Sequence, residues 1–363
     1  MDATRSNTKR AKAAITTALP FVVVAAMVFF VWRYHALIAQ AFHEIRGAEP
    51  AVLPLTVVGA AVSMYAMGYV THSLLYAGDV KVSTRNCVHL ALASNAWSAS
   101  LPGGQAFAAM LSFTVMRSWG ASALVCSWQI VLSAVLSSTW LVALGVVTIF
   151  VLGASLSLSS LGLSLLGLSA TVWAVYYIAH HPHVLRPLAR WGLGMVNRVR
   201  RAPAGTGLSA VEDHISRLDA VYLSPKRFAA TAAASLLNWL GDVVVLWACV
   251  WAVSGAMPLW EARSDETTIM GVVLAFVTAK IAGTVQATPG GIGPVEAALT
   301  GTLVAAGLPA TTALGAVLIF RLVTFFGLVA IGWVVYAAKY ASIGKSLRAG
   351  KTSTPGEVGY EAA

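Results

Sequence analysis

Apolar residues occur in runs long enough to cross a lipid bilayer, and short polar stretches separate these runs. A spanning helix needs about 20 predominantly apolar residues. The chain is therefore expected to be an all-α polytopic membrane protein. The pattern predicts uninterrupted helices over 13–32, 51–75, 121–152, 161–179 and 228–254.

Two further apolar runs are interrupted where a helix should continue. Proline lacks the N–H that a helix needs, and glycine places no side-chain restraint on the backbone. Broken backbone at membrane depth is tolerated only where protein or a water-filled cavity covers it. These breaks are therefore the first candidates for a functional site. They consist of Pro102, Gly103 and Gly104 in the first run, and of Pro289, Gly290, Gly291 and Gly293 in the second.

The surroundings of the two breaks match. A glycine follows each proline after 18 residues, and a long apolar helix comes next. Each broken unit, 86–152 and 269–338, thus has a helix, a break, a short segment and a long helix. The short segments, 105–118 and 292–306, are shorter than a full span, so they are expected to form re-entrant hairpins. Three full crossings in each unit are the alternative.

Composition excludes several classes of protein. Only 10% of the residues are charged and 58% are apolar, whereas soluble domains have about 25% charged residues. The formal charge of +10 comes mostly from loop Lys and Arg, so it reports orientation and lipid contact rather than nucleic-acid binding. A chain of 363 residues with this membrane content leaves no room for a large soluble enzyme module.

Charge in the loops predicts two halves of opposite orientation. The basic stretch 180–227 belongs on the cytoplasmic side, and the acidic loop 255–268 suits the outside. Counting crossings then makes the halves inverted copies, an architecture of many transporters. About six full helices and two re-entrant hairpins are expected, or 8–10 apolar helices in total. The expected parts are a cytoplasmic segment 1–12, membrane repeats 13–152 and 153–338, and a disordered cytoplasmic tail 339–363.

The first apolar run has a second interpretation. A cleaved signal peptide would also place an apolar stretch after basic residues, and Ala39-Gln40-Ala41 resembles a cleavage site. The length of the run and the inverted plan favour a retained helix.

Polar residues at membrane depth are costly and mark functional positions. Asn238 and Asp242 lie one helical turn apart. Glu296 opens the helix after the second break, where a carboxylate suits the positive end of the helix dipole. Arg321 follows on the next helix and is expected to fold back toward Glu296. The full set is Asn95, Arg117, Gln129, Asn238, Asp242, Lys280, Gln286, Glu296 and Arg321.

Two hypotheses account for these charges. In one, Lys280, Arg321 and the N–H groups after the breaks receive a lipid phosphate, because helix N-termini favour anions. In the other, Glu296–Arg321 and Asp242–Lys280 are structural ion pairs. The candidate substrate-binding residues are Pro102, Gly103, Gly104, Arg117, Asn238, Asp242, Lys280, Gln286, Pro289, Gly290, Gly291, Gly293, Glu296 and Arg321.

Two signatures carry a family resemblance. Gln286-Ala-Thr-Pro-Gly-Gly-Ile-Gly-Pro-Val-Glu296, followed by Phe320-Arg321-Leu-Val-Thr324, resembles the lysylphosphatidylglycerol synthase/flippase transmembrane family. Asn95-Ala-Trp-Ser-Ala-Ser-Leu-Pro102-Gly-Gly resembles the N-terminal signature of that family, although Gln105-Ala106 replaces a Gly-acid pair. The resemblance implies a lipid-translocating role. Some members also carry a cytosolic aminoacyltransferase domain, which is not seen in this sequence.

The expected function is therefore a lipid flippase that moves a phospholipid or a lipid-linked headgroup between leaflets of the cell membrane, with both termini cytoplasmic. Catalytic motifs are lacking, so an enzyme is not favoured, and no cofactor or metal is expected. Expected partners are membrane lipids and a lipid-synthesis enzyme at 180–227. The alternative is an accessory protein or transferase of lipid or envelope-glycolipid synthesis, with candidate groups Glu212, Asp213 and His214.

Overall fold

A computed structural model describes residues 35–101, 103–152, 177, 224–284 and 288–340. Every regular element in these ranges is helical. The helices predicted at 13–32 and 161–179, most of the basic loop and the tail lie outside the described residues. The elements are α2 (His35–Gly47), α3 (Leu53–Ala77), α4 (Thr84–Ser100), α5 (Gly104–Ser118), α6 (Ala123–Val151), α10 (Pro225–Ser254), α11 (Ile269–Gly283), η2 (Pro289–Gly291), α12 (Pro294–Ala305), α13 (Ala310–Arg321), η3 (Leu322–Gly327) and α14 (Leu328–Lys339).

Four described helices are long and apolar enough to cross a membrane. They are α3, α6, α10 and the continuous helix from Ala310 to Lys339, which joins α13, η3 and α14. These helices agree with the predicted spans to within a few residues. The prediction of an all-α membrane protein is therefore confirmed.

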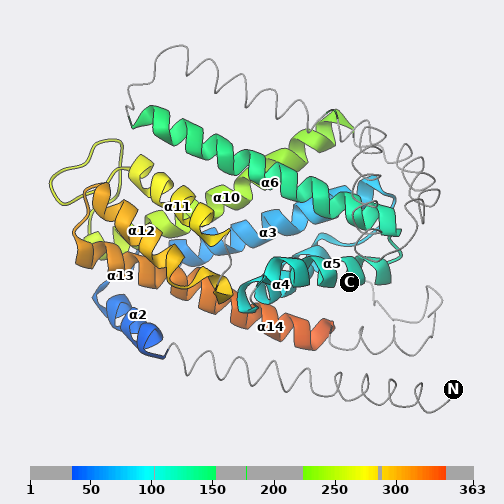
Figure 1. The fold of residues 1–363 in the computed structure, drawn as a ribbon, viewed down its shortest axis with the longest axis horizontal. Helices are drawn as coiled ribbons and strands as arrows, with labels where there is room; N and C mark the ends of the chain where they lie inside the picture. Colours follow the sequence, from blue (N-terminus) through cyan, green and yellow to red (C-terminus); the bar gives the residue numbers. More distant parts are fainter. Residues whose placement is uncertain (1–34, 102, 153–176, 178–223, 285–287, 341–363) are drawn as a thin grey trace, which may run out of the picture.

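Helices α3 and α10 form the antiparallel centre of the bundle (Figure 1). Near one end, the Glu49 N–H donates to the Ala252 carbonyl over 2.8 Å. Near the other end, the hydroxyls of Ser73 and Thr231 are 2.6 Å apart. Since α3 begins where α10 ends, the two helices run in opposite directions.

Each of the two breaks joins a pair of shorter helices. Helices α4 and α5 pack together, and their outer ends contribute Cys87 and Met116 to one hydrophobic cluster. Helices α11 and α12 also pack together, with the hydroxyls of Thr278 and Thr302 3.0 Å apart. The open end of the first hairpin (α4–α5), opposite its break, lies where α3 ends. The open end of the second hairpin (α11–α12) lies beside the end of α10 (Figure 1).

The tips of the two hairpins lie against the same long helix. Ile292 in the second break packs against a cluster that contains Ala96 of α4 and Trp333 of α14. The Trp333 Nε1 also donates to Ser100 Oγ at the end of α4 over 3.0 Å. The two breaks are therefore neighbours inside the molecule rather than separate surface loops.

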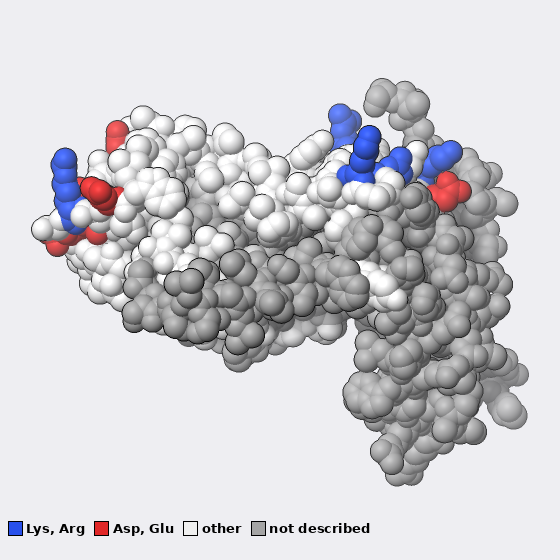
Figure 2. Space-filling model, turned by 90° about the horizontal axis from the view of Figure 1, so that it is seen from above, with Lys and Arg blue, Asp and Glu red and all other residues white. Residues whose placement is uncertain are grey.

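Charged side chains lie at the two ends of the face in Figure 2, with an uncharged middle between them. We call one the basic end and the other the acidic end. The basic end is where α3, α5 and α14 end and α4 and α10 begin. The charged residues in or beside these helix ends are Lys81, Arg85, Arg117, Lys226, Arg227 and Lys339 against Asp79. The acidic end carries Glu44, Glu49, Glu261, Asp265 and Glu266 against Arg46 and Arg263.

Two elements were not predicted. Helix α2 lies between the helices predicted at 13–32 and 51–75, where no helix was predicted, and it packs against α13. The segment η3 is a π-helix inside a run that was expected to be regular. Its Phe325 ring covers Gly290, where an added Cβ would overlap ring atom Cε2. This tertiary contact has no counterpart in the local sequence.

Candidate functional site

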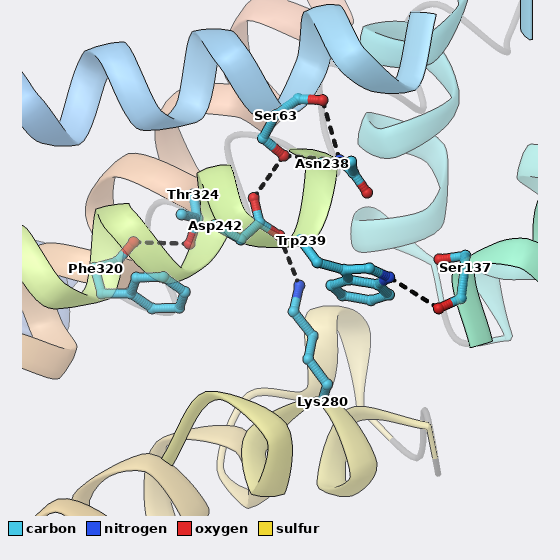
Figure 3. Close-up of polar contacts among 8 residues, drawn as sticks. All are labelled: Ser63, Ser137, Asn238, Trp239, Asp242, Lys280, Phe320 and Thr324. Atoms are coloured by element: carbon cyan, nitrogen blue, oxygen red, sulfur yellow. Dashed lines mark hydrogen bonds and ion pairs between the residues drawn. The ribbon is translucent and has the colours of Figure 1, made fainter. Parts of the chain in front are cut away.

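The polar centre of the molecule lies where α3 and α10 cross. The helices approach closely because both are glycine there: a Cβ added to Gly241 would lie 2.8 Å from the Gly59 carbonyl oxygen. Small residues commonly permit such close helix contacts in membranes. The approach brings Ser63 of α3 to Asp242 of α10, and Ser63 Oγ donates to Asp242 Oδ1 over 2.7 Å (Figure 3).

Asn238 completes the contact between the two central helices. It lies one turn before Asp242, as predicted, and on the same side of α10. Its Nδ2 donates to the Ser63 carbonyl over 3.0 Å and to Ser63 Oγ over 2.8 Å. The three side chains therefore form one hydrogen-bonded chain across the crossing, with the carboxylate at its end.

Lys280 reaches this carboxylate from the second hairpin. Its Nζ lies 3.0 Å from Asp242 Oδ2, and its side chain is 35% exposed while that of Asp242 is 14% exposed. The ammonium also faces the ring of Trp239 at 5.0 Å and that of Phe276 at 4.9 Å. Such cation–aromatic contacts add to the attraction of the carboxylate. Figure 3 shows Lys280 extending from α11 toward α10.

The ring that faces Lys280 is itself held in place. The Trp239 Nε1 donates to the Ser137 carbonyl of α6 over 2.9 Å. This bond satisfies the indole N–H and fixes the orientation of the ring. Helices α3, α6, α10 and α11 thus all contribute to the surroundings of one ammonium group.

A second ion pair lies at the second break. Arg321 Nε is 2.6 Å from Glu296 Oε1, so the two side chains form a close ion pair. The Arg321 Nη2 donates to the Gly290 carbonyl over 2.8 Å, and the guanidinium carbon lies 4.5 Å from the Phe325 ring centroid. Arg321 is 9% exposed. It therefore joins the break to the π-helical segment.

Glu296 also closes the start of α12. Its Oε2 accepts a hydrogen bond from the Gly293 N–H over 2.6 Å. A carboxylate at the third helical position that reaches back to the N-cap is a common way to satisfy a free N–H. Both oxygens of this carboxylate therefore have a partner: Oε1 contacts Arg321, and Oε2 accepts from the Gly293 N–H.

The N–H groups near the breaks are largely occupied as well. The Gly291 N–H donates to the Thr288 carbonyl and the Ile292 N–H donates to that of Pro289. At the first break, the Gly104 N–H donates to the Leu101 carbonyl. An anion that binds at either break must therefore compete with turn hydrogen bonds in this conformation.

The structure brings together only part of the predicted set. Asn238, Asp242 and Lys280 meet at one site, and Gly290, Gly293, Glu296 and Arg321 meet at the other. Arg117 is separate, because it lies at the end of α5 and its Nη1 donates to the Ala121 carbonyl over 2.7 Å. Pro102, Gln286, Glu212, Asp213 and His214 lie outside the described residues.

Four participants were not predicted: Ser63, Ser137, Trp239 and Phe276. Each comes from an ordinary apolar stretch, and the residues involved are far apart in the chain. The one local signal was the Gly-Asp step at 241–242, since a glycine inside a spanning helix permits close approach of a neighbour.

Comparison with known proteins agrees with this architecture. The family model of the lysylphosphatidylglycerol synthase transmembrane region matches residues 17–332. A UPF0104 membrane protein of Methanothermobacter thermautotrophicus is 29% identical over 107 residues. That alignment covers 30% of this chain and 29% of the relative, so it spans less than a third of the relative's length. The chain is a multi-pass membrane protein and belongs to the lysylphosphatidylglycerol synthase transmembrane-region family.

Proposed function

We propose that this protein moves a phospholipid, or a lipid-linked headgroup, between the two leaflets of the cell membrane. The observation that carries the proposal is the polar centre between α3, α10 and the second hairpin, where Lys280 is held by one carboxylate and stays partly exposed. Charged groups at membrane depth usually serve transport or a ligand.

The directions of the helices support two inverted halves. Helix α3 runs from the acidic end to the basic end. The chain enters and leaves the first hairpin at the basic end, and α6 then runs back to the acidic end. Helix α10 runs from the basic end to the acidic end. The chain enters and leaves the second hairpin at the acidic end, and α13–α14 then runs back to the basic end. Two similar halves of opposite orientation exchange inward-open and outward-open shapes at similar energy, which is the logic of alternating access.

The same arrangement supports re-entrant hairpins and an orientation. Helices α4, α5, α11 and α12 have 17, 15, 15 and 12 residues, which is short of the ~20 needed for a full span. The basic end would face the cytoplasm by the positive-inside rule. Residues 13–152 and 153–338 would then be the two membrane repeats, with both termini cytoplasmic.

The phosphate of the lipid would be received first by Lys280. Its side chain is the more exposed of the two central cations, and it has a single carboxylate partner among the described residues. Arg321 is buried and bonded to the second break, so it would join the site only after the hairpin moves. Asn238, Gly290, Gly291 and Gly293 would line the path between the two pairs.

Reconstitution into vesicles tests this proposal. Phosphatidylglycerol labelled on an acyl chain is placed in both leaflets, and a membrane-impermeant reductant then bleaches the label that is exposed outside. Translocation is expected to let the reductant bleach nearly all of the label, whereas protein-free vesicles keep the inner pool. Lys280→Gln is expected to slow bleaching at least about tenfold, by loss of an ion-pair contact of roughly 1.4 kcal/mol with the phosphate.

Lys339→Gln is the matched control, because it removes a lysine at the exposed end of α14. Its bleaching rate is expected to equal that of the wild type. Folded protein that leaves the inner pool intact would refute the proposal, and the accessory-protein alternative would then be preferred.

A further inference from the structure

If the proposed function holds, Lys280 binds two different anions in turn, and this inference rests on that function. In the structure its ammonium binds Asp242. In the lipid-bound state it would bind a phosphate diester. A single ammonium cannot neutralise two anions, so the fate of Asp242 in the lipid-bound state decides the charge of the site.

The Asp242 carboxylate has few stabilising contacts once Lys280 has moved away from it. Its Oδ1 retains one hydrogen bond from Ser63, whose own Oγ already accepts from Asn238. Its position in the middle of α10 places it far from the start of the helix, so no free backbone N–H stabilises the carboxylate. An ionised carboxylate with one neutral donor in a low-dielectric interior is strongly unfavourable.

The helices around Asp242 offer no replacement cation among the described residues. On α3, Tyr65 is exposed and His72 is bonded to the Val82 carbonyl. On α11, Lys280 is the charged residue. On α13, Arg321 is already paired with Glu296. Helix α6 contributes Ser137 through Trp239 and carries no Lys, Arg or His, and α2 places Glu44 and Arg46 at the acidic end.

Glu296 behaves differently when its cation is removed. Its Oε2 still accepts the Gly293 N–H, and it still lies at the positive end of α12. A helix N-terminus stabilises a carboxylate without any cation. Glu296 is therefore expected to stay ionised, whereas Asp242 is not.

We infer that Asp242 takes up one proton from solvent each time Lys280 transfers from Asp242 to the lipid phosphate. Before binding, the carboxylate and the ammonium cancel. After binding, the ammonium and the phosphate diester cancel, and the carboxylic acid is neutral. The site has zero net charge in both states, which lowers the cost of moving it through the membrane.

The coupling is reciprocal, because two ligands that depend on one residue must affect each other equally. Lipid binding raises proton affinity, and protons raise lipid affinity. Lipid affinity is therefore expected to rise as the pH is lowered and to fall as the pH is raised. The loaded site carries the lipid and the proton together, so an acidic compartment accelerates lipid movement out of the leaflet that faces it.

Calorimetry measures the number of protons that the protein takes up when it binds the lipid. The full chain in detergent is titrated with dihexanoyl phosphatidylglycerol in two buffers of equal pH but different ionisation enthalpy, and the difference in heat gives the protons taken up. The diester does not titrate near neutral pH. One proton per bound lipid is expected for the wild type, and none for Asp242→Asn.

Two controls locate the proton. Glu296→Gln is expected to take up one proton for each lipid it still binds, which separates the two carboxylates. Dihexanoylglycerol has the same chains without a phosphate and is expected to cause no uptake. If Asp242→Asn does not fold, Asp242→Ser replaces it in the same comparison.

The outcomes distinguish this inference from the proposed function. Lipid binding by the wild type without proton uptake overturns the coupling and leaves the lipid site standing. Uptake that persists without the Asp242 carboxylate also overturns it. Failure of the wild type to bind the lipid overturns the lipid site itself, and the coupling with it.

Discussion

The two ion pairs flank the same hairpin but hold it in different ways. Asp242–Lys280 joins α10 to α11 through a lysine that is 35% exposed. Glu296–Arg321 joins α12 to α13 through an arginine that also bonds a backbone carbonyl and stacks on a ring. To break the first pair, Lys280 has to exchange its contact with Asp242 for another anion. To break the second pair, Arg321 also has to lose the contacts that hold the second break in its observed conformation.

The difference suggests a division of roles. The planar guanidinium makes several directed contacts at once, and the lysine ammonium is a single charge on a flexible stem. Arg321 is therefore suited to fixing the shape of the hairpin tip, and Lys280 is suited to changing partners. The two hypotheses drawn from the sequence, structural pair and ligand site, then apply to different pairs rather than competing for both.

The largest expected effect is the loss of Arg321. Arg321→Gln removes the ion pair with Glu296, the hydrogen bond to the Gly290 carbonyl and the contact with the Phe325 ring. Because each of the two polar contacts involves a charged group and is worth about 1.5–3 kcal/mol, a total loss of about 3–5 kcal/mol is expected. Lys280→Gln is the matched change, and its cost is expected to be smaller, because Lys280 is partly solvated and the carboxyl group of Asp242 becomes neutral when the ammonium is absent. Thermal melting of both variants in the same detergent measures the contrast.

Equal losses of stability would remove the division of roles. Lipid movement by the folded fraction of each variant provides a second measure. Normal folding of Arg321→Gln together with lost lipid movement would mean that Arg321 acts on the ligand and not on the fold.

The hairpin tips provide the next comparison. Gly290→Ala places a Cβ against Phe325 Cε2, at a residue whose φ is +61°. Crowding is expected to cost about 1–3 kcal/mol, in addition to about 1–2 kcal/mol for the left-handed backbone. Gly103→Ala at the first break has a φ of +63° with nothing within 4 Å, so only the backbone cost applies.

The difference between the melting temperatures of these two variants isolates the crowding. The double variant Gly290→Ala/Phe325→Leu is expected to recover much of it, because a smaller side chain vacates the space. Equal destabilisation by the two alanines would show that Phe325 does not hold the second tip as the structure has it.

Sequence alone predicted the four long described helices and both breaks, because long apolar runs and Pro-Gly-Gly triplets are local signals. It also named the partners of both ion pairs, since a few charges in an apolar interior have few possible partners. Ser63 was missed because its role depends on the register between α3 and α10, which the Gly59–Gly241 contact sets and which brings Ser63 to Asp242, 179 residues later. Trp239 was missed because its ring is placed by the Ser137 carbonyl of α6, 102 residues away, and faces Lys280 of α11. The π-helical segment was missed because it lies within a continuous apolar run, and its contact with Gly290 is a tertiary one.

The crossing of α3 and α10 tests that register. Gly241→Ala places a Cβ 2.8 Å from the Gly59 carbonyl oxygen and 2.9 Å from the Ser63 nitrogen. Because both neighbours are backbone atoms, the helices must separate, at an expected cost of about 1–3 kcal/mol. The separation is also expected to weaken the Ser63–Asp242 hydrogen bond and thus the site of Lys280.

Gly301→Ala is the control, since this glycine lies inside α12 with nothing within 4 Å of an added Cβ. Alanine is favoured over glycine in a helix by about 0.5–1 kcal/mol, so this variant is expected to melt slightly higher. A Gly241→Ala protein that melts as high as Gly301→Ala would contradict the close crossing.

The smallest expected effect concerns the ring beside Lys280. Trp239→Phe keeps an aromatic face but loses the hydrogen bond to the Ser137 carbonyl, at a cost of about 0.5–1.5 kcal/mol. Trp239→Leu loses the face as well, and with it a cation–aromatic contact of about 0.5–2 kcal/mol. If the ring helps Asp242 to hold Lys280, then Trp239→Leu frees the lysine and raises lipid affinity relative to Trp239→Phe, even though it lowers the melting temperature. Calorimetry of both variants with short-chain phosphatidylglycerol gives the sign. Lower lipid affinity in Trp239→Leu would mean that the ring belongs to the ligand site itself, and Lys280 would then exchange partners without leaving its aromatic neighbours.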